Sequence, residues 1–307
     1  HDPIEQHVLE ALGHARARGP RSGSGPRAVV DPGEILDDLR LVKDGHELTL
    51  LGRAAAISME GHRAGARAIE VGAGEWSVEA AVNAAFRAGG GGGPGYQTIV
   101  GSGANACFLH YVDNSAVIGP DALVLVDAGA ECGLYHGDVT RTYPAAGRFT
   151  PEQRDVYEIV DEARQAAIAA ISPGAPIEDV HAAATRVLAR GLVSLGVLDG
   201  DIDGLVEGQA HKPFYPHQTS HWLGLDVHDP GDYARDGVSR RLESGMVFTV
   251  EPGLYFRPER PDTPEHLAGI GVRIEDDVVV TSDGCEVLTR NLPTSLRAVE
   301  DLARSGQ

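Results

Sequence analysis

The sequence predicts an α+β fold built from two related halves. Along the 307 residues, two helical segments followed by strand-rich segments occur twice. A short echo accompanies this order, because Gly72-Ala73 with Val78 matches Gly174-Ala175 with Val180 at a constant spacing. Hydrophobic residues make up 42% and charged residues 23% of the chain, which is typical of a globular domain with a sizeable core. We therefore expect one α+β domain with a duplicated architecture.

In the first half, amphipathic spacing predicts three helices and alternating or apolar runs predict three strands. A glycine-rich segment, 89–95, separates them and lacks the Gly-Lys-Ser/Thr ending of a phosphate-binding loop, so it is interpreted as a flexible connection. Ser77 is expected to cap the third helix. The predicted elements are helices Asp31–Leu41, Asp44–Ile69 and Ser77–Phe86, and strands Tyr96–Val100, Ala106–Tyr111 and Ala122–Val126.

In the second half, Thr150 and Gln153 form the sequence pattern of a capping box, with Pro151 in the first helical turn. This predicts a helix from Thr150. The remaining elements predicted are a helix at Ile177–Gly196 and strands at Met246–Val250 and Gly271–Thr281.

The segment Arg16–Arg27 is basic and rich in Gly, Pro and Ser, which predicts either an exposed surface loop or the end of an interdomain linker. The chain begins with His1 rather than Met. We interpret residues 1–40 as a linker or the remnant of a missing N-terminal domain, and residues 41–307 as the functional domain.

The charge balance restricts the partners. There are 26 Lys and Arg against 45 Asp and Glu, a net charge of −19, which argues against nucleic acid or an anionic membrane as a partner. No apolar run of about 18 residues predicts a membrane span. The 3 cysteines are odd in number and far apart, which favours a reducing, cytoplasmic location.

Two acidic residues flank a glycine-rich turn. Asp127 ends the apolar strand ALVLVDAG, and Asp138 follows in GDVTRT. A hairpin between them would bring both carboxylates together, although two solvated turn aspartates would give the same pattern. A carboxylate at the end of a buried strand needs a partner, since an unpaired buried charge is costly.

The second half adds histidines and further carboxylates. HQTSHWLGLDVHD contains His217, His221 and His228, but Gln218 excludes a zinc-protease HExxH motif. Glu251 ends the strand MVFTV, and strand alternation places Arg273 and Glu275 on one face, where they form either an exposed ion pair or part of a polar site.

These residues suit a pair of metal ions. Four carboxylates (Asp127, Asp138, Glu251 and Glu275) balance two divalent cations, with His221 as a neutral fifth ligand. Oxygen-rich ligands with one imidazole suit Mn²⁺, Co²⁺, Fe²⁺ or Zn²⁺.

The five residues and their surroundings resemble the methionine aminopeptidase, prolidase and aminopeptidase P superfamily. The segments YQTIVGSGANACFLHY, VDAGAECGLYHGDVTRT, TSHWLGLDVHD, TVEPGLY and GIGVRIEDD are most similar to those of the bacterial Xaa-Pro aminopeptidases, and the similarity covers Leu41–Pro293. The resemblance implies the two-halved pita-bread fold. It makes residues 41–307 the metallopeptidase catalytic domain.

The resemblance also implies individual roles. Asp127 and Asp138 would hold one metal, His221 and Glu251 the other, and Asp138 and Glu275 would bridge both. The remaining roles concern catalysis: Glu251 would transfer a proton, His110 and His228 would surround the scissile bond, His217 would line the substrate pocket, and Arg273 and Tyr255 would support the site from behind.

The function implied is hydrolysis of the N-terminal Xaa-Pro bond of proline-containing peptides with two divalent ions, Mn²⁺ being the first choice. Xaa-Pro dipeptidase (prolidase) is the nearest alternative. A metal-free creatinase-like hydrolase and an inactive peptide-binding scaffold are less favoured, because all five ligands are present. The resemblance leaves a homo-oligomer open.

Overall fold

The computed structural model describes residues 3–22 and 30–306. The chain divides into two compact units, His1–Asp38 and Leu39–Gln307. In the first unit, helix α1 (Pro3–Ser22) includes part of the segment expected to be a loop. The loop prediction is therefore wrong for Arg16–Ser22: Ala17 and its flanking arginines favour a helix, and the helix continues to Ser22 despite Gly19 and Pro20. The rest of that predicted loop lies outside the described residues. Helix α2 (Gly33–Leu41) matches its predicted position.

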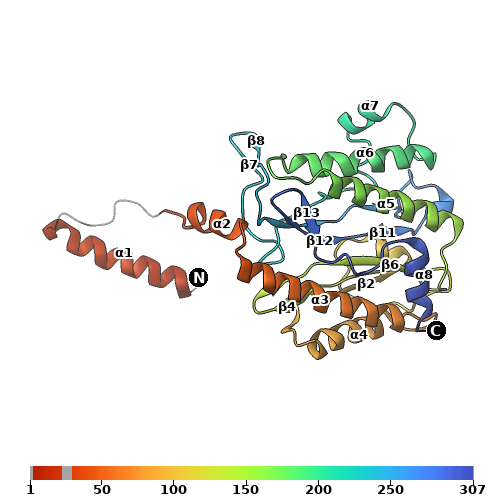
Figure 1. Ribbon diagram of the computed structural model, residues 1–307, viewed down its shortest axis with the longest axis horizontal. Helices are drawn as coiled ribbons and strands as arrows, with labels where there is room; N and C mark the ends of the chain where they lie inside the picture. The colour runs from red at the N-terminus through yellow and green to blue at the C-terminus, as the bar shows by residue number, and fades with distance from the viewer. Residues whose placement is uncertain (1–2, 23–29, 307) are drawn as a thin grey trace. The chain divides into compact units, whose positions relative to one another are not determined.

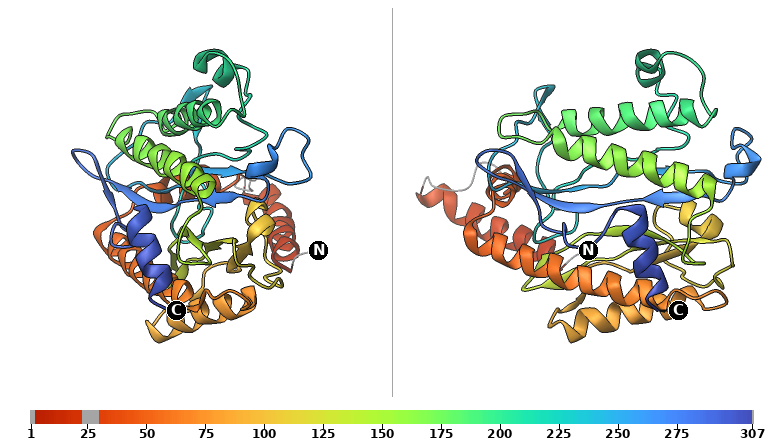
Figure 2. Two further views of the ribbon diagram at one scale, coloured as in Figure 1. Left: turned by 90° about the vertical axis from the view of Figure 1, so that its right-hand side faces the viewer. Right: turned by 45° about the vertical axis from the view of Figure 1, so that its right-hand side comes forward.

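The second unit contains two pairs of helices with strands between them (Figure 1). Helices α3 (Gly45–Ala68) and α4 (Glu75–Ala88) cover one side, and α5 (Pro151–Ala169) and α6 (Glu178–Ser194) cover the other (Figure 2). Asp44 and Thr150 form the capping boxes of α3 and α5, so these two helix starts are confirmed.

All strand pairs are antiparallel. One sheet has the order β2 (Ile99–Ser102), β3 (Leu123–Asp127), β6 (Thr140–Pro144). Another has the order β13 (Cys285–Val287), β12 (Asp276–Val280), β9 (Val247–Val250), and β10 (Gly253–Tyr255) pairs with β11 (Gly271–Arg273). Isolated bridges between Thr140 and Glu275 and between Val42 and Met246 connect the two halves. The predicted α+β class is confirmed by this arrangement.

Shorter elements complete the second unit. They are β1 (Gly93–Pro94), η1 (Gly103–Cys107), β4 (Ala130–Cys132), β5 (Tyr135–His136), α7 (Ile202–Glu207), β7 (Ala234–Arg235), β8 (Val238–Ser239), η2 (Glu265–Leu267) and α8 (Leu296–Arg304).

The duplication is visible in the backbone hydrogen bonds. Gly72 and Gly174 both have positive φ, 89° and 83°, a conformation that favours glycine. The Gly72 amide donates to Ile118 (2.9 Å), and the Gly174 amide donates to Leu242 (2.8 Å). The same turn therefore introduces α4 and α6, as the sequence echo predicts.

Two predicted elements differ in the structure because of a buried carboxylate. Helix α4 begins at Glu75 rather than Ser77. The Glu75 side chain, 0% exposed, accepts hydrogen bonds from the Ser102 amide, the Tyr111 hydroxyl and the Ala116 amide. These bonds fold 102–116 around the start of α4, so Ala106–Tyr111 is not a strand. It is the end of η1 and a turn.

The second-half strand predicted at Gly271–Thr281 is interrupted. It forms β11 and β12, which are separated at Ile274 and Glu275. The interruption changes the strand partner from β10 to β9 and places Glu275 opposite Thr140.

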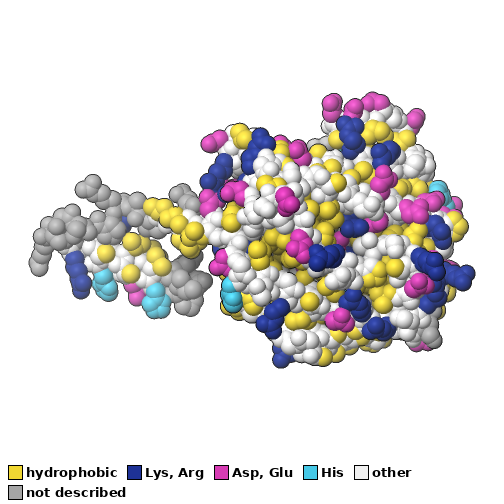
Figure 3. Space-filling view, viewed as in Figure 1, with side chains coloured by type: hydrophobic (Ala, Val, Ile, Leu, Met, Phe, Trp, Pro, Cys, Tyr) yellow, Lys and Arg dark blue, Asp and Glu magenta, His cyan; other side chains and the backbone are white. Residues whose placement is uncertain are grey.

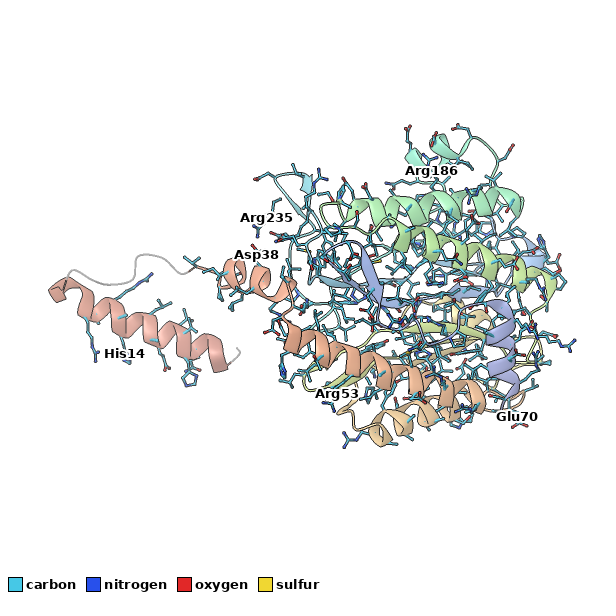
Figure 4. The ribbon with its side chains drawn as sticks, viewed as in Figure 1. His14, Asp38, Arg53, Glu70, Arg186 and Arg235 are labelled. Atoms are coloured by element: carbon cyan, nitrogen blue, oxygen red, sulfur yellow. The ribbon has the colours of Figure 1, made fainter. Side chains whose placement is uncertain are left out.

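On the face shown in Figure 3, acidic side chains gather over α7. Asp203 of α7 pairs with Arg186 of α6 at 2.6 Å (Arg186 is labelled in Figure 4). No helix in the described part of the chain has both the length and the apolarity needed to cross a membrane.

Candidate metal centre and active site

The first carboxylate pair lies where β3 ends and β6 begins. Asp127 is the last residue of β3 and faces Thr140 of β6 in the ladder, while Asp138 comes two residues before Thr140. The hairpin between them, β4 and β5, turns through Gly133 and Leu134, both with positive φ. The hairpin predicted from the glycine-rich sequence is thus present, and it holds both carboxylates on one side.

The Tyr96 hydroxyl links these two carboxylates. It lies 2.6 Å from Oδ1 of Asp127 and 2.6 Å from Oδ1 of Asp138. Burial, and then the charges of the carboxylates, raise the pKa of Tyr96 well above its usual value, so its hydroxyl remains protonated and available as a donor.

The second half supplies His221 and Glu251. Nε2 of His221 lies 3.3 Å from Oδ2 of Asp138 and 3.5 Å from Oε1 of Glu251. Nδ1 of His221 lies 3.2 Å from the carbonyl of Trp222, to which it donates. This bond leaves Nε2 directed toward the carboxylates.

The donor set fits divalent cations. Ligand atoms of Asp138, His221 and Glu275 lie within 4.8 Å of one another. Glu251 lies beside them, with its Oε1 3.5 Å from Nε2 of His221. Asp127 is linked to Asp138 by the Tyr96 hydroxyl, which lies within hydrogen-bond distance of both carboxylates. Carboxylate oxygens with one imidazole nitrogen are the ligands expected for such ions. All five predicted ligands are therefore gathered at one place.

Protonation behaviour agrees with a site that needs cations. Burial is the largest cause of the raised pKa values of Asp127, Glu251 and Glu275, and repulsion between these carboxylates and Asp138 adds to it. The pKa of Glu251 rises to about 7, and that of Glu275 lies well above its usual range. At His221, burial lowers the pKa, but Asp138 and Glu251 outweigh it and raise the value to about 9. Without metal, protons take the place of the missing positive charge.

Arg273 organises the carboxylates from behind. Its guanidinium lies 2.5 Å from Oδ2 of Asp127 and donates through Nε to the Thr140 hydroxyl at 3.0 Å. Thr140 in turn donates to Oε2 of Glu275 at 2.6 Å. Arg273 also donates to the Tyr255 hydroxyl at 3.1 Å. One arginine therefore fixes ligands from both halves of the chain.

His217 belongs to the same network. Its Nε2 lies 2.9 Å from the Tyr255 hydroxyl, and its Nδ1 lies 2.8 Å from the carbonyl of Gln218 and 3.6 Å from Glu251. Burial and the charge of Arg273 lower the pKa of His217 to about 3. The ring is therefore neutral, and it donates from Nδ1 and accepts from Tyr255 at Nε2.

His228 and His110 lie at the wall of the cleft. The ring of His228 packs edge-on against His221 with centroids 4.4 Å apart. Next to it, Asp229 is buried and paired with Lys43 at 3.1 Å and with Arg40, which holds the loop in place. His110 follows η1 on the segment that Glu75 folds.

A cleft of about 1470 Å³ opens over these residues. Its walls come from both halves: Gly95–Gln97 and Leu109–His110 on one side, and Ile177–Glu178, His217–His221, Asp226–Gly231 and Tyr233–Ala234 on the other. A short peptide fits a space of this size.

Sequence reasoning missed three residues of the site. Tyr96 stands at the start of YQTIVGSGANACFLHY and Thr140 stands in GDVTRT, but neither is a ligand type that metal spacing detects. Asp277 is buried and accepts the Asp138 amide at 3.2 Å. The alternation that relates Arg273 to Glu275 could have extended to Asp277.

Comparisons with known proteins agree with this geometry. The model of metallopeptidase family M24 matches residues 49–282. Xaa-Pro aminopeptidase from Escherichia coli (strain K12) is 42% identical over 295 residues, covering 96% of this chain and 66% of that protein. Xaa-Pro aminopeptidase 2 from Streptomyces coelicolor is 44% identical, covering 87% of this chain and 57% of that protein. The chain thus spans less than two thirds of the length of these curated relatives.

A solved structure shows the same fold. Pseudomonas aeruginosa aminopeptidase PepP superposes with a TM-score of 0.96 and is 42% identical, covering 100% of this chain and 69% of that one. The predicted pita-bread fold is confirmed. The family match, the shared fold and the convergence of carboxylates and histidine lead to one conclusion: this chain belongs to metallopeptidase family M24 and is similar to Xaa-Pro aminopeptidases of that family.

Proposed function

We propose that this chain hydrolyses the N-terminal Xaa-Pro bond of proline-containing peptides and depends on two divalent cations. The observation that carries the proposal is the convergence of Asp138, His221 and Glu275 within 4.8 Å, with Asp127 and Glu251 beside them. The names of the relatives supply the substrate class.

Asp127 and Asp138 would hold one ion and His221 and Glu251 the other, with Asp138 and Glu275 shared between them. When bound, the two ions would polarise the scissile carbonyl and lower the pKa of water toward about 7. Mn²⁺ is our first choice because oxygen donors dominate the set, and Co²⁺, Zn²⁺ or Fe²⁺ would fit the same donors.

The protein's own groups would then move protons and orient the substrate. Glu251, beside His221 at the centre of the site, would accept a proton from water and return it to the leaving proline nitrogen. His228 and His110, on the cleft wall, would donate hydrogen bonds to the carbonyl oxygen as it gains charge. His217 and Arg273 would position Tyr255 and the carboxylates.

The decisive experiment compares Arg-Pro-Pro with Gly-Pro after metal removal and reconstitution with Mn²⁺. We expect release of free Arg from Arg-Pro-Pro, detected by mass spectrometry, and loss of activity with a chelator. The Glu275→Gln variant should be inactive. Glu286→Gln, which changes an exposed glutamate paired only with Arg290 among the described residues, is the matched control and should retain activity.

Preference for Gly-Pro would instead indicate a dipeptidase, and cleavage that survives complete metal removal would exclude the dinuclear proposal.

We also propose a reducing, cytoplasmic location. The supporting observation is that all three cysteines are free, with Cys107 and Cys132 buried.

A further inference from the structure

Helix α3 carries a buried histidine that the proposed mechanism does not use. His62 is 0% exposed and faces the hairpin that joins Asp127 to Asp138. Its Nε2 lies 3.1 Å from the carbonyl oxygen of Ala128 and 3.0 Å from that of Val139. These carbonyls belong to the residues that directly follow the two aspartates.

The two acceptors define the state of the ring. Carbonyl oxygens only accept, so Nε2 must carry the hydrogen and donate to both. Burial, followed by the charge of Arg141, lowers the pKa of His62 to about 4, so the ring is neutral near pH 7. Nδ1 is buried and has no hydrogen-bond partner within the described residues. The ring therefore leaves one buried nitrogen unsatisfied, which costs free energy, while its other nitrogen donates to two carbonyls at once.

The ring closes the hairpin at the rung nearest the carboxylates. The Ala128 amide donates to the Val139 carbonyl at 3.0 Å, so His62 adds a second donor to a bond that already joins the two strands. Beyond this rung, Gly129 approaches Gly137 so closely that a Cβ on Gly129 would lie 1.7 Å from the Gly137 carbonyl oxygen. The position of Asp127 relative to Asp138 therefore depends on this junction, where a slip would move one carboxylate away from the other.

We propose that His62 is a positioning residue that preorganises Asp127 and Asp138 for metal binding by donating one N–H to both of the carbonyls that follow them. This inference rests on the proposed dinuclear site. It assigns His62 no contact with metal or substrate. Removing a group that orients ligands in this way typically lowers metal affinity by about 10-fold to 100-fold.

The test is titration of the metal-free protein with Mn²⁺, followed by the electron paramagnetic resonance signal of the free ion. His62→Leu keeps an apolar side chain of similar size but removes the donor, and we expect Mn²⁺ affinity to fall at least 10-fold. His62→Gln offers an amide N–H to the same carbonyls, and we expect its affinity to lie within about threefold of the parent.

Val82→Ala is the matched control. Val82 is a buried residue of α4 that packs against Gly65 of α3, so its truncation loosens the same helix and removes no hydrogen-bond donor from the hairpin. Its Mn²⁺ affinity should equal that of the parent, even though urea unfolding shows reduced stability.

If His62→Leu binds Mn²⁺ as tightly as the parent does, His62 contributes only packing and the inference is overturned. If the leucine variant does not fold, His62→Gln decides: affinity reduced 10-fold or more in a stably folded glutamine variant has the same consequence. A parent chain that binds no Mn²⁺ overturns the dinuclear site and this inference together. Failure to cleave Xaa-Pro peptides, with Mn²⁺ binding intact, affects only the proposed activity.

Discussion

Replacing Glu251 with glutamine tests the electrostatics of the metal centre directly. Glu251 is surrounded by other carboxylates, and only 17% of its side chain is exposed. The pKa of Glu251 rises from 4.5 to about 7, chiefly because burial disfavours the charged form. Glutamine has nearly the same shape but never carries the charge.

The size of the effect follows from the linkage between proton binding and folding. Each tenfold change in proton affinity corresponds to about 1.4 kcal/mol, so the raised pKa is equivalent to about 3 kcal/mol. The folded-state pKa lies above the unfolded value. The stabilisation that comes from protonated Glu251 is therefore complete below pH 4.5 and is lost as the pH rises through about 7. The Glu251→Gln variant has no carboxyl at this position, so its free energy of unfolding does not fall for this reason as the pH rises.

The assay is urea unfolding of both metal-free proteins, with a chelator present, at several pH values between 4.5 and 8. Other buried groups also titrate here, including His62, His181 and His217, whose pKa values are lowered to about 4, 4 and 3. They are common to both proteins and largely cancel in the difference between the two unfolding free energies. That difference reports Glu251 together with His221 and Glu275, whose pKa values Glu251 raises. That difference should shift by about 3 kcal/mol in favour of the glutamine variant as the pH rises.

Saturating Mn²⁺ should reverse the order at pH 7, because the parent gains binding free energy that the variant lacks. A difference that stays constant over this pH range would show that Glu251 is not desolvated in the folded protein. A glutamine variant that Mn²⁺ stabilises as much as it stabilises the parent would show that Glu251 is not a ligand.

Three further predictions use other parts of the site. Asp138→Asn should lose at least one equivalent of metal in elemental analysis and all measurable turnover, because Asp138 lies within reach of His221 and Glu275; full metal occupancy would contradict its role. His228→Ala should keep its metal but lose about 100-fold in kcat, since the ring lines the cleft beside His221 without ligating; parent-like turnover would remove His228 from catalysis. Lys43→Met should lower the free energy of unfolding by about 3 kcal/mol in urea titrations, because it leaves Asp229 buried with less positive charge beside it. Unchanged stability would show that Arg40 alone is sufficient to neutralise Asp229.

Local sequence signals predicted a large part of the fold. Thr150 caps α5 where its capping pattern predicted it, because such bonds connect residues only three positions apart, and α3 begins beside Asp44 as its amphipathic spacing predicted. Local signals failed at Ala106–Tyr111, where the spacing suits a strand. Glu75, distant in sequence, draws that segment into a turn by accepting hydrogen bonds from the Tyr111 hydroxyl and from the Ser102 and Ala116 amides on either side of it.

The identities of the five metal-ligand candidates could be predicted, because ligand residue types are few and each lies at the end of a strand or beside a turn. Of the residues that hold these ligands, only Arg273 and Tyr255 were anticipated. Tyr96, Thr140 and His62 are not marked by ligand spacing, and their importance depends on which atoms they reach.

The sequence by itself determined the secondary-structure order, the duplication and the acidic, histidine-containing candidates, since these depend on periodicity, turn chemistry and residue type. Only the tertiary structure decided that one arginine, Arg273, reaches Asp127 and, through Thr140, Glu275. It also decided that a helix near the start of the domain contacts the hairpin between the aspartates. Such contacts join residues far apart along the chain, and their geometry is set by the packing of the two halves, which no local pattern encodes.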